Sequence, residues 1–473
     1  MAESRHYDVV VIGAGSTGEN VADRAAKGGL SAVIVEAELV GGDCSYWACM
    51  PSKALLRAMS ALRGAQRVGG AREAVTGDLD VDAVLARRDS FTSNWDDSSQ
   101  VSWVENAHVD LVRGHAKLAG ERRVVALTRD GPLSLLANHA VVVASGSVPA
   151  MPPVPGLAEA KPWTTRDATS AKEVPPRLAV LGGGVAGCEL AQAFASLGSD
   201  VTVLELGGRV LAASEPFASE IVAGSLKESG IDVRTGVAVR GVDRTSSGTV
   251  LVTLDDGVLV VDEMLVAAGR RARTDDIGLE TVGLQPGSWL DVDDTMSVQG
   301  VEGGWLYACG DVNHRVLLTH QGKYQARACG DGIAARARGQ FDPKPWGKFS
   351  ATADHRAVPS VIFTDPEVGS VGLTEAQAKS AGLNVRAVDY KMGDVSGAHL
   401  YADNYNGQAR MVVDEDRHVI VGATFVGPEA GELVHAATVA IVGEVPLERL
   451  WHAVPSYPTI SEIWLRLLEA YGM

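Results

Sequence analysis

Short apolar runs alternate with glycine-rich turns and helical patterns along much of the chain. The apolar run 7–12 meets the segment Gly13–Gly18 and then a helical pattern to about Lys27, which predicts a strand, a tight turn and a helix. A second apolar run, 31–35, is followed by Glu36. This position is close to the ~20-residue interval at which a dinucleotide-binding unit places its ribose-binding acid. The first stretch therefore predicts a nucleotide-binding unit.

The same order of elements returns later in the chain. A strand over 177–181 leads into the segment Gly182–Gly187, a helix to about Leu197 and a second strand over 200–204 that is followed by Glu205. One such glycine motif is weak evidence, because a glycine-rich loop can also form without a ligand. Two motifs in the same context predict two bound adenine dinucleotides.

Changes of pattern divide the remaining chain. The apolar run 139–143 and the proline-rich stretch 150–156 mark a boundary, and a further strand, 304–308, ends in the turn Cys309–Asp311. From about Phe349, short alternating strands (360–364, 408–413 and 419–425) are interleaved with helices and lack a phosphate loop. We therefore predict an α/β protein with two Rossmann-like dinucleotide-binding domains, 1–150 with 270–345 and 151–269, and a C-terminal α+β dimerisation domain, 346–473.

Composition and charge narrow the class of protein. The 473 residues are 46% hydrophobic and 21% charged, the balance of a folded protein of roughly three domains. The net charge of −17 disfavours nucleic acid and anionic membranes as partners. No apolar stretch approaches the ~18 residues of a membrane helix, and no signal peptide precedes the first strand. We expect a cytoplasmic protein.

Two of the five cysteines, Cys44 and Cys49, are closely spaced. In a regular helix their alpha carbons would lie roughly 8 to 9 Å apart, beyond the ~7 Å limit for a disulfide. They can therefore bridge only if Cys44 precedes the helix or its first turn is distorted. Pro51 favours a helix start at Cys49, where the helix dipole lowers the pKa of a thiol. Zinc would need two more ligands, so a redox disulfide is favoured over metal binding or inert thiols.

These motifs carry a family resemblance that covers essentially the whole chain. The segment Cys44-x-x-x-x-Cys49-x-Pro51-Ser52-Lys53, the two glycine loops and the Cys309–Asp311 turn resemble the class I pyridine nucleotide-disulfide oxidoreductases. The resemblance implies an FAD enzyme that passes electrons from a nicotinamide cofactor through flavin and the cysteine pair to a small-molecule acceptor. It also implies a homodimer with the active site shared across its interface.

The resemblance further implies a role for individual residues. Cys49 is the charge-transfer thiolate beside the flavin, Cys44 is the interchange sulfur, and Lys53 lies near the hydride-accepting flavin nitrogen, paired with Glu189. The alternative for Lys53 and Glu189 is that each is an exposed helix charge. The implied cofactor-binding residues, with Lys53, are Gly13, Gly15, Gly18, Glu36, Gly42, Gly146, Gly310 and Asp311, and Gly182, Gly184, Gly187, Glu205 and Gly269.

Glu205 indicates which nicotinamide cofactor binds. An acid at this strand end accepts hydrogen bonds from a free ribose diol and repels a 2′-phosphate, so NADH is favoured over NADPH. Arg209, four residues later, would soften this preference.

The carboxyl-terminal motif departs from the family pattern. Disulfide-reducing members carry His-Pro-x-x-x-Glu, whereas this chain has Tyr457 at the histidine position and retains Glu462. Tyrosine, with a pKa near 10, is a poor proton shuttle at neutral pH. We therefore expect the acceptor to be a quinone, a metal ion or an uncommon disulfide. His452 is an alternative base, although a surface histidine is the simpler interpretation.

Other readings of the function stay open. They are dihydrolipoamide dehydrogenase or another ordinary disulfide reductase, and a non-enzymatic flavin or nucleotide sensor. A dedicated mercuric reductase is disfavoured, because no cysteine follows Cys329 and no metal-binding extension precedes the first strand. The aromatic pair Tyr46 and Trp47 either shapes an acceptor pocket or packs in the core.

Overall fold

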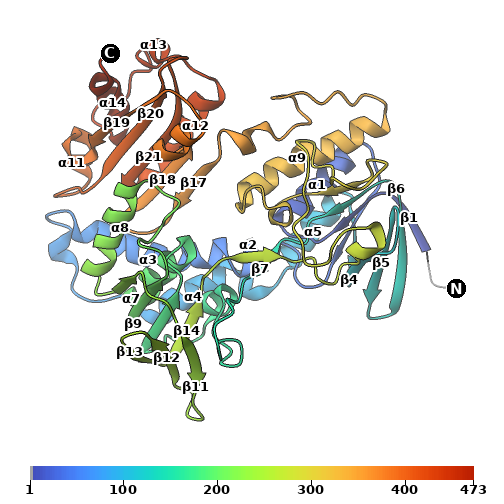
Figure 1. The fold of residues 1–473 in the computed structure, drawn as a ribbon, viewed down its shortest axis with the longest axis horizontal. Coiled ribbons are helices and arrows are strands. Elements are labelled where there is room, and N and C mark those ends of the chain that lie inside the picture. Colours follow the sequence, from blue (N-terminus) through green and yellow to red (C-terminus); the bar gives the residue numbers. More distant parts are fainter. Residues whose placement is uncertain (1–3) are drawn as a thin grey trace. The chain divides into compact units, whose positions relative to one another are not determined.

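The computed structural model describes residues 4–473, which divide into two compact units. Unit 1 contains residues 4–51, 89–150 and 270–355, and unit 2 contains residues 52–88, 151–269 and 356–473. Figure 1 follows the chain through both units by colour. Each unit is thus assembled from three separate stretches of sequence.

Unit 1 is built on a seven-stranded sheet in the order β3-β2-β1-β6-β5-β4, with β16 also pairing β6. Strands β1, β2, β3 and β16 run parallel to their neighbours, and β4, β5 and β6 form an antiparallel meander. A two-stranded ladder joins β7 to β15. The strands are β1 (Ser4–Ile12), β2 (Ala32–Glu36), β3 (Asp110–Arg113), β4 (His115–Leu118), β5 (Arg123–Thr128), β6 (Gly131–Val143), β7 (Ser147–Pro149), β15 (Arg270–Ala272) and β16 (Leu306–Ala308).

Two helices cover one face of this sheet, α1 (Ser16–Lys27) and α9 (Thr319–Ala337), which lie side by side in Figure 1. They approach closely because α9 carries glycine where they cross. A Cβ on Gly322 would lie 2.4 Å from Thr17 Oγ1, and one on Gly330 would lie 2.6 Å from Arg24 Cβ. Arg24 also pairs with Asp331 through a two-pronged hydrogen bond. The crossing therefore depends on small residues and a charged clamp.

Four further helices lie between β2 and β3 in the sequence. They are α2 (Gly42–Tyr46), α3 (Cys49–Gln66), α4 (Val81–Phe91) and α5 (Ser98–Asn106). The backbone break at Trp47 and Ala48 separates α2 from α3, so Cys44 and Cys49 do not share one regular helix.

Unit 2 contains a four-stranded parallel sheet in the order β10-β9-β8-β14 and a three-stranded antiparallel sheet, β11-β12-β13. The fully buried Leu178, Val180 and Phe194 contribute to the core of the parallel sheet. The elements are β8 (Arg177–Leu181), β9 (Asp200–Glu205), β10 (Asp232–Thr235), β11 (Gly241–Arg244), β12 (Val250–Leu254), β13 (Gly257–Val261), β14 (Glu263–Val266), α6 (Thr165–Ser170), α7 (Val185–Ser196) and α8 (Pro216–Glu228).

The carboxyl-terminal part of unit 2 is a five-stranded antiparallel sheet in the order β17-β18-β21-β20-β19. Its central strand, β21, is buried along its whole length. The elements are β17 (Pro359–Ile362), β18 (Glu367–Gly372), β19 (Val385–Lys391), β20 (Gln408–Asp414), β21 (Val419–Gly427), α10 (Glu375–Ser380), α11 (Ser396–Tyr401), α12 (Val434–Val442), α13 (Leu447–Leu450) and α14 (Ile463–Tyr471). This mixed α/β architecture confirms the predicted fold class.

The main disagreement with the predicted strands concerns 304–308. The strand begins only at Leu306, because Gly303 and Gly304 adopt left-handed conformations with φ of 86° and 58°. The predicted division into three domains stays a prediction. Within residues 4–473, no helix is long and apolar enough to cross a bilayer.

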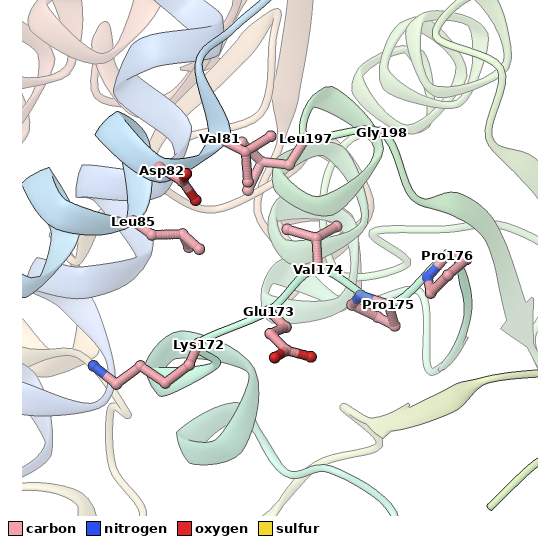
Figure 2. Close-up of a pocket in the computed structure, with 10 residues that line it drawn as sticks. All are labelled: Val81, Asp82, Leu85, Lys172, Glu173, Val174, Pro175, Pro176, Leu197 and Gly198. Carbon is pink, nitrogen blue, oxygen red and sulfur yellow. The ribbon is translucent and has the colours of Figure 1, made fainter.

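A surface pocket of about 450 Å³ lies in unit 2, between α4 and the segment 172–176. Figure 2 shows Val81 and Leu85 on one side and Val174 and Pro175 on the other. A second pocket, of about 710 Å³, lies in unit 1 and includes Arg5, Arg113 and Arg129. Neither pocket is lined by a residue that the sequence predicts to be functional.

Candidate functional site

The first glycine loop, in unit 1, leaves an open approach to a helix N-terminus. A Cβ on Gly18 would lie 1.9 Å from the Gly13 carbonyl oxygen, so only glycine allows the close turn between β1 and α1. At Gly15, the N-cap of α1, a Cβ would meet no atom within 4 Å. The loop is therefore tight against the protein on one side and open on the other. Such an N-terminus, with unpaired backbone N–H groups, suits a phosphate.

The second loop, in unit 2, repeats these distances. A Cβ on Gly187 would lie 1.9 Å from the Gly182 carbonyl oxygen, whereas one on Gly184, the N-cap of α7, would meet nothing within 4 Å. The two units thus present two equivalent tight turns, each with an open helix N-terminus.

The acids at the two strand ends also occupy equivalent positions. Glu36 accepts a hydrogen bond from the backbone N–H of Ala14 at 2.6 Å, and Glu205 accepts one from that of Gly183 at 2.6 Å. Each carboxylate therefore lies beside its glycine loop, as a ribose-binding acid must. Arg209 donates instead to the carbonyl oxygens of Ala212 and Ser214.

The two cysteines are held by the two short elements that follow the first nucleotide unit. Cys44 lies in α2, and Cys49 is the first residue of α3, where a helix N-terminus stabilises a thiolate. No disulfide joins them in this structure. A hydrogen bond with Cys49, burial and repulsion from Cys49 raise the pKa of Cys44.

Thr319, at the start of α9, contacts this pair. Its hydroxyl oxygen lies 3.2 Å from Cys49 Sγ and can donate a hydrogen bond to the thiolate. The sequence prediction missed this residue, because nothing local in residues 315–320 links it to a cysteine 270 positions earlier. Tyr46, by contrast, is buried and packs edge-on against Trp47, with ring centroids 5.7 Å apart.

Arg270 connects the redox segment of unit 1 to the turn after β16. Its guanidinium lies 3.2 Å from Asp43, beside Cys44, and donates to Ser147 Oγ at 2.5 Å. Ser147 in turn donates to Asp311 at 2.5 Å. Arg270 and Ser147 were not predicted as functional residues, although their neighbours Gly269 and Gly146 were.

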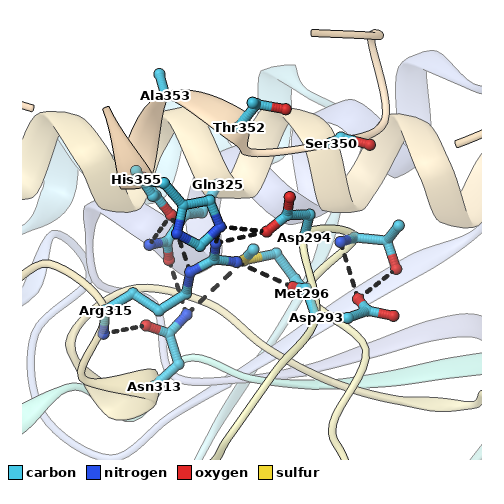
Figure 3. A network of polar contacts seen from close by, with 12 residues as sticks. Asp293, Asp294, Met296, Asn313, Arg315, Gln325, Ser350, Thr352, Ala353 and His355 are labelled. Carbon is cyan, nitrogen blue, oxygen red and sulfur yellow. Dashed lines mark hydrogen bonds and ion pairs between the residues drawn. The ribbon is translucent and has the colours of Figure 1, made fainter. Parts of the chain in front are cut away.

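A polar network that includes Asn313, Arg315 and Gln325 (Figure 3) also contacts this turn. The buried Gln325 accepts hydrogen bonds from the Gly310 N–H and from Asn313, and donates to Asp354. Burial raises the pKa of Asp354 against the hydrogen bonds from Gln325 and Gln321 and the Arg315 charge. The backbone N–H of Gly310, next to Asp311, is thus held by the Gln325 side chain on α9.

In unit 2, Lys53 and Glu189 form an ion pair, with Lys53 Nζ 2.6 Å from Glu189 Oε2. The other carboxylate oxygen accepts a hydrogen bond from the backbone N–H of Phe363, whose ring lies 4.9 Å from Lys53 Nζ. The Glu189 side chain is only 3% exposed. This pair, a half-buried lysine on a buried and satisfied carboxylate, differs from the alternative of two exposed helix charges.

The carboxyl-terminal residues of the motif do not come together. The Tyr457 residue is 75% exposed, whereas Glu462 is buried and bonded through Oε1 to Arg466 at 2.5 Å. Glu462 Oε2 has no hydrogen-bond partner among residues 4–473. His452, the alternative base, is exposed. The same described region holds no cluster of three or more His, Cys, Asp or Glu residues that could bind a metal ion.

Comparison with known proteins identifies the family. Residues 7–326 match the family model for pyridine nucleotide-disulphide oxidoreductases, and residues 358–467 match the model of that family's dimerisation domain. The chain belongs to the pyridine nucleotide-disulphide oxidoreductase family. The match to the dimerisation domain indicates that this oxidoreductase is a homodimer.

The curated relatives of this oxidoreductase include enzymes with different acceptors. It is 31% identical over 461 residues to mercuric reductase from Staphylococcus aureus, covering 96% of this chain and 81% of the relative. It is 32% identical over 475 residues to dihydrolipoyl dehydrogenase from Thermus scotoductus, covering 98% and 97%. The relatives thus agree on the family and differ in the reaction.

Solved structures share the fold of this oxidoreductase. The copper(II) complex of the HOCl-induced flavoprotein disulfide reductase RclA from Escherichia coli superposes with a TM-score of 0.84 at 23% identity, covering 98% of this chain and 99% of that one. LpdA from Mycobacterium tuberculosis gives a TM-score of 0.82 at 22% identity, with both chains fully covered.

The protein is therefore a flavoprotein oxidoreductase that uses FAD and a nicotinamide cofactor. The residues present fit both groups, because each glycine loop closes tightly on the protein and leaves open the position beside the helix N-terminus. The Gly13 loop with Glu36 would hold FAD, and the Gly182 loop with Glu205 would hold the nicotinamide cofactor.

Proposed function

We propose that this oxidoreductase takes electrons from NADH and delivers them, through flavin and the pair Cys44 and Cys49, to a small acceptor that needs no histidine base. The acceptor class is a quinone, a metal ion or an uncommon disulfide. One observation carries the proposal: an intact thiol pair coexists with a carboxyl-terminal motif whose Tyr457 is exposed and whose Glu462 stays buried. The input half of a disulfide reductase is thus retained, while its usual proton shuttle is absent.

The thiols have unequal roles in this proposal. Cys49, at the N-terminus of α3 and within reach of the Thr319 hydroxyl, is the thiolate that faces the flavin. Cys44, whose pKa is raised, keeps its proton longer and is the sulfur that meets the acceptor. FAD, held by the Gly13 loop with Glu36, would supply the hydride-accepting ring beside Cys49. The protein's part is to hold one sulfur ionised and the other protonated.

Lys53 and Glu189 prepare the flavin side. A lysine near a ring that gains electrons offsets the developing negative charge, and the Glu189 carboxylate offsets the cost of burying that lysine. Phe363 fixes both groups, through its backbone N–H and its ring. Both residues therefore act as positioned charges.

The cofactor is NADH rather than NADPH. Glu205 lies beside the second glycine loop, where its charge would repel a 2′-phosphate. Arg209 already donates hydrogen bonds to two backbone carbonyl oxygens, which supports NADH over NADPH.

Three further expectations belong to this proposal. They are the division into FAD-binding, nicotinamide-binding and dimerisation domains, an active site shared between two subunits, and a cytoplasmic location. A native particle with a mass other than that of two chains, or a monomer with full activity, would contradict the shared site.

Dihydrolipoamide dehydrogenase activity is the second candidate, because dihydrolipoyl dehydrogenase from Thermus scotoductus is 32% identical over nearly the whole length of both chains. The two candidates predict different substrates for the same purified protein. Steady-state rates with NADH would be measured against a set of quinones, metal ions, small disulfides and lipoamide. Fast lipoamide turnover would favour the second candidate and overturn the first.

Cys44→Ser provides the matched control for that experiment. Acceptors that require the thiol pair should lose turnover in this variant, whereas an acceptor reduced directly by flavin should keep it. A set of acceptors that are all unaffected by Cys44→Ser would remove the thiol pair from the proposed pathway.

A further inference from the structure

In unit 2, the loop that joins β9 to α8, residues 206–215, closes against the second glycine loop. The backbone N–H of Leu211 donates a hydrogen bond to the Gly183 carbonyl oxygen at 2.8 Å, and the Gly183 N–H donates to Glu205. Leu211 is only 3% exposed and adopts a left-handed conformation with φ of 49°. Leucine rarely adopts this conformation, which persists only where surrounding contacts hold it. The β9–α8 loop is therefore a strained segment that needs firm anchors.

Glu215 anchors the far end of this loop. The residue is only 2% exposed, its Oε1 accepts a hydrogen bond from the Glu375 backbone N–H at 2.7 Å, and its Oε2 lies 3.1 Å from Arg410 Nη1. One helical turn further on, the hydroxyl of Ser219 donates to the Val210 carbonyl oxygen at 2.6 Å. A buried carboxylate is stable only with such partners, because the loss of one leaves a charge unpaired.

Arg410, on β20, holds Glu215 as part of a larger ion-pair network. Its Nε and Nη2 donate to the two carboxylate oxygens of Asp389 on β19, each at 2.7 Å, and its Nη1 also donates to Glu375 on α10 at 2.9 Å. The guanidinium carbon lies 5.4 Å from the ring centroid of Phe217 on α8, and the Arg410 side chain is only 16% exposed. Because the two-pronged contact with Asp389 fixes the plane of the guanidinium, Nη1 is directed at Glu215.

This network links the β9–α8 loop to the antiparallel sheet of unit 2. Strands β19 and β20 and helix α10 all lie within residues 358–467, which match the dimerisation domain of the family. The loop itself lies beside Glu205 and the second glycine loop. A side chain outside the nucleotide-binding elements therefore determines how firmly the loop beside them is held.

We propose that Arg410 is a positioning residue for coenzyme binding: through Glu215 it keeps the β9–α8 loop closed against the segment Gly182–Gly187, and so sets how tightly the nicotinamide coenzyme is held. The inference rests on the proposed assignment of this glycine loop and Glu205 to the coenzyme. Arg410 acts through Glu215 alone, and no bond is formed or broken. Because bound coenzyme meets the same closed loop with or without Arg410, weaker closure lowers the affinity and leaves the following hydride step unchanged.

Anaerobic stopped-flow reduction of the bound flavin separates affinity from rate. The purified holoenzyme would be mixed with increasing concentrations of NADH, and separately of NADPH, with no acceptor present. Arg410→Met should leave the loop closed for about one tenth to one third of the time, which raises the apparent dissociation constant about threefold to tenfold, since that constant varies inversely with the closed fraction. The limiting rate of flavin reduction should stay at the wild-type value.

Two milder substitutions keep the test decisive if Arg410→Met does not fold. Glu215→Gln retains an oxygen for the Glu375 N–H and removes the charge that Arg410 holds, so it should raise the dissociation constant by a similar factor. The double variant should bind coenzyme no more weakly than either single variant, because both act on the same contact. Arg410→Lys keeps the charge without the planar fork and should recover part of the affinity.

Arg177→Met is the matched control, since Arg177 forms a comparable two-pronged ion pair with Asp262, at 2.8 and 3.0 Å, at the other end of β8 from Gly182. It should leave the dissociation constant unchanged. An unchanged constant in Arg410→Met and Glu215→Gln, or an equal rise in Arg177→Met, would overturn the inference and leave the proposed function intact. A wild-type flavin that neither coenzyme reduces would overturn both, whereas a wrong acceptor class would affect only the proposed function, because no acceptor is present.

Discussion

Replacing Thr319 by valine should raise the pKa of the Cys49 thiol by about one unit. Valine keeps the shape of threonine and removes the hydroxyl that lies 3.2 Å from Cys49 Sγ. A hydrogen bond to a charged group contributes about 1.5–3 kcal/mol, and 1.36 kcal/mol corresponds to one pKa unit, so complete loss would shift the pKa by about one to two units. Because Cys49 is half-buried, water replaces part of the lost hydrogen bond, and we expect a pKa shift at the lower end of this range.

The assay follows the long-wavelength absorption of the thiolate beside the oxidised flavin, in enzyme reduced by two electrons. Its intensity is titrated with pH in the wild type, Thr319→Val and Thr319→Ser. The midpoint should move upward in Thr319→Val and stay close to the wild-type value in Thr319→Ser, because serine keeps the hydroxyl. An unmoved midpoint in Thr319→Val, or an equal shift in both variants, would show that the contact does not stabilise the thiolate.

Four other substitutions test three separate parts of the site. Gly18→Ala should prevent folding of unit 1, since its Cβ would lie 1.9 Å from the Gly13 carbonyl oxygen, whereas Gly15→Ala should fold and lose FAD affinity. Thermal unfolding and flavin titration separate these outcomes, and equal melting temperatures of the two variants would contradict them. Glu205→Ala should narrow the preference of kcat/KM for NADH over NADPH, and a wild type that prefers NADPH would refute the reasoning. Tyr457→His should raise the steady-state rate of lipoamide reduction, by up to the factor of ~10² to 10⁴ that is typical of general-base catalysis, and should leave the stopped-flow rate of flavin reduction unchanged. A variant altered only in flavin reduction would show that Tyr457 does not control the reduction of the acceptor.

Features with a local cause were accessible from the sequence. Both nucleotide units follow from a strand, a glycine turn and a helix in immediate succession, and the helix start at Cys49 follows from Pro51 two residues later. The pairing of Lys53 with Glu189 came from the family resemblance, because the two residues are 136 positions apart.

Features created by tertiary packing were not accessible. Thr319 and Arg270 carry no local pattern that sets them apart from an ordinary helix-end hydroxyl or surface arginine. Thr319 and Arg270 acquire their significance only when α9 and β15 are folded beside segments more than 200 residues distant. The sequence does not identify the acceptor either, since relatives of similar identity are named as enzymes that catalyse different reactions.

The discontinuity of unit 1 has a consequence for synthesis of the protein on the ribosome. Residues Val141–Val143 of β6 pair on one side with β1. On their other side, among residues 4–473, they pair with β16 alone, which leaves the ribosome about 160 residues later. At 5–20 residues per second, this edge of fully buried valines waits on the order of ten to thirty seconds for its partner. During that time it presents unpaired backbone groups that favour association with other chains. Nascent chains stalled before Leu306 should therefore aggregate or bind chaperones, whereas chains released after β16 should not.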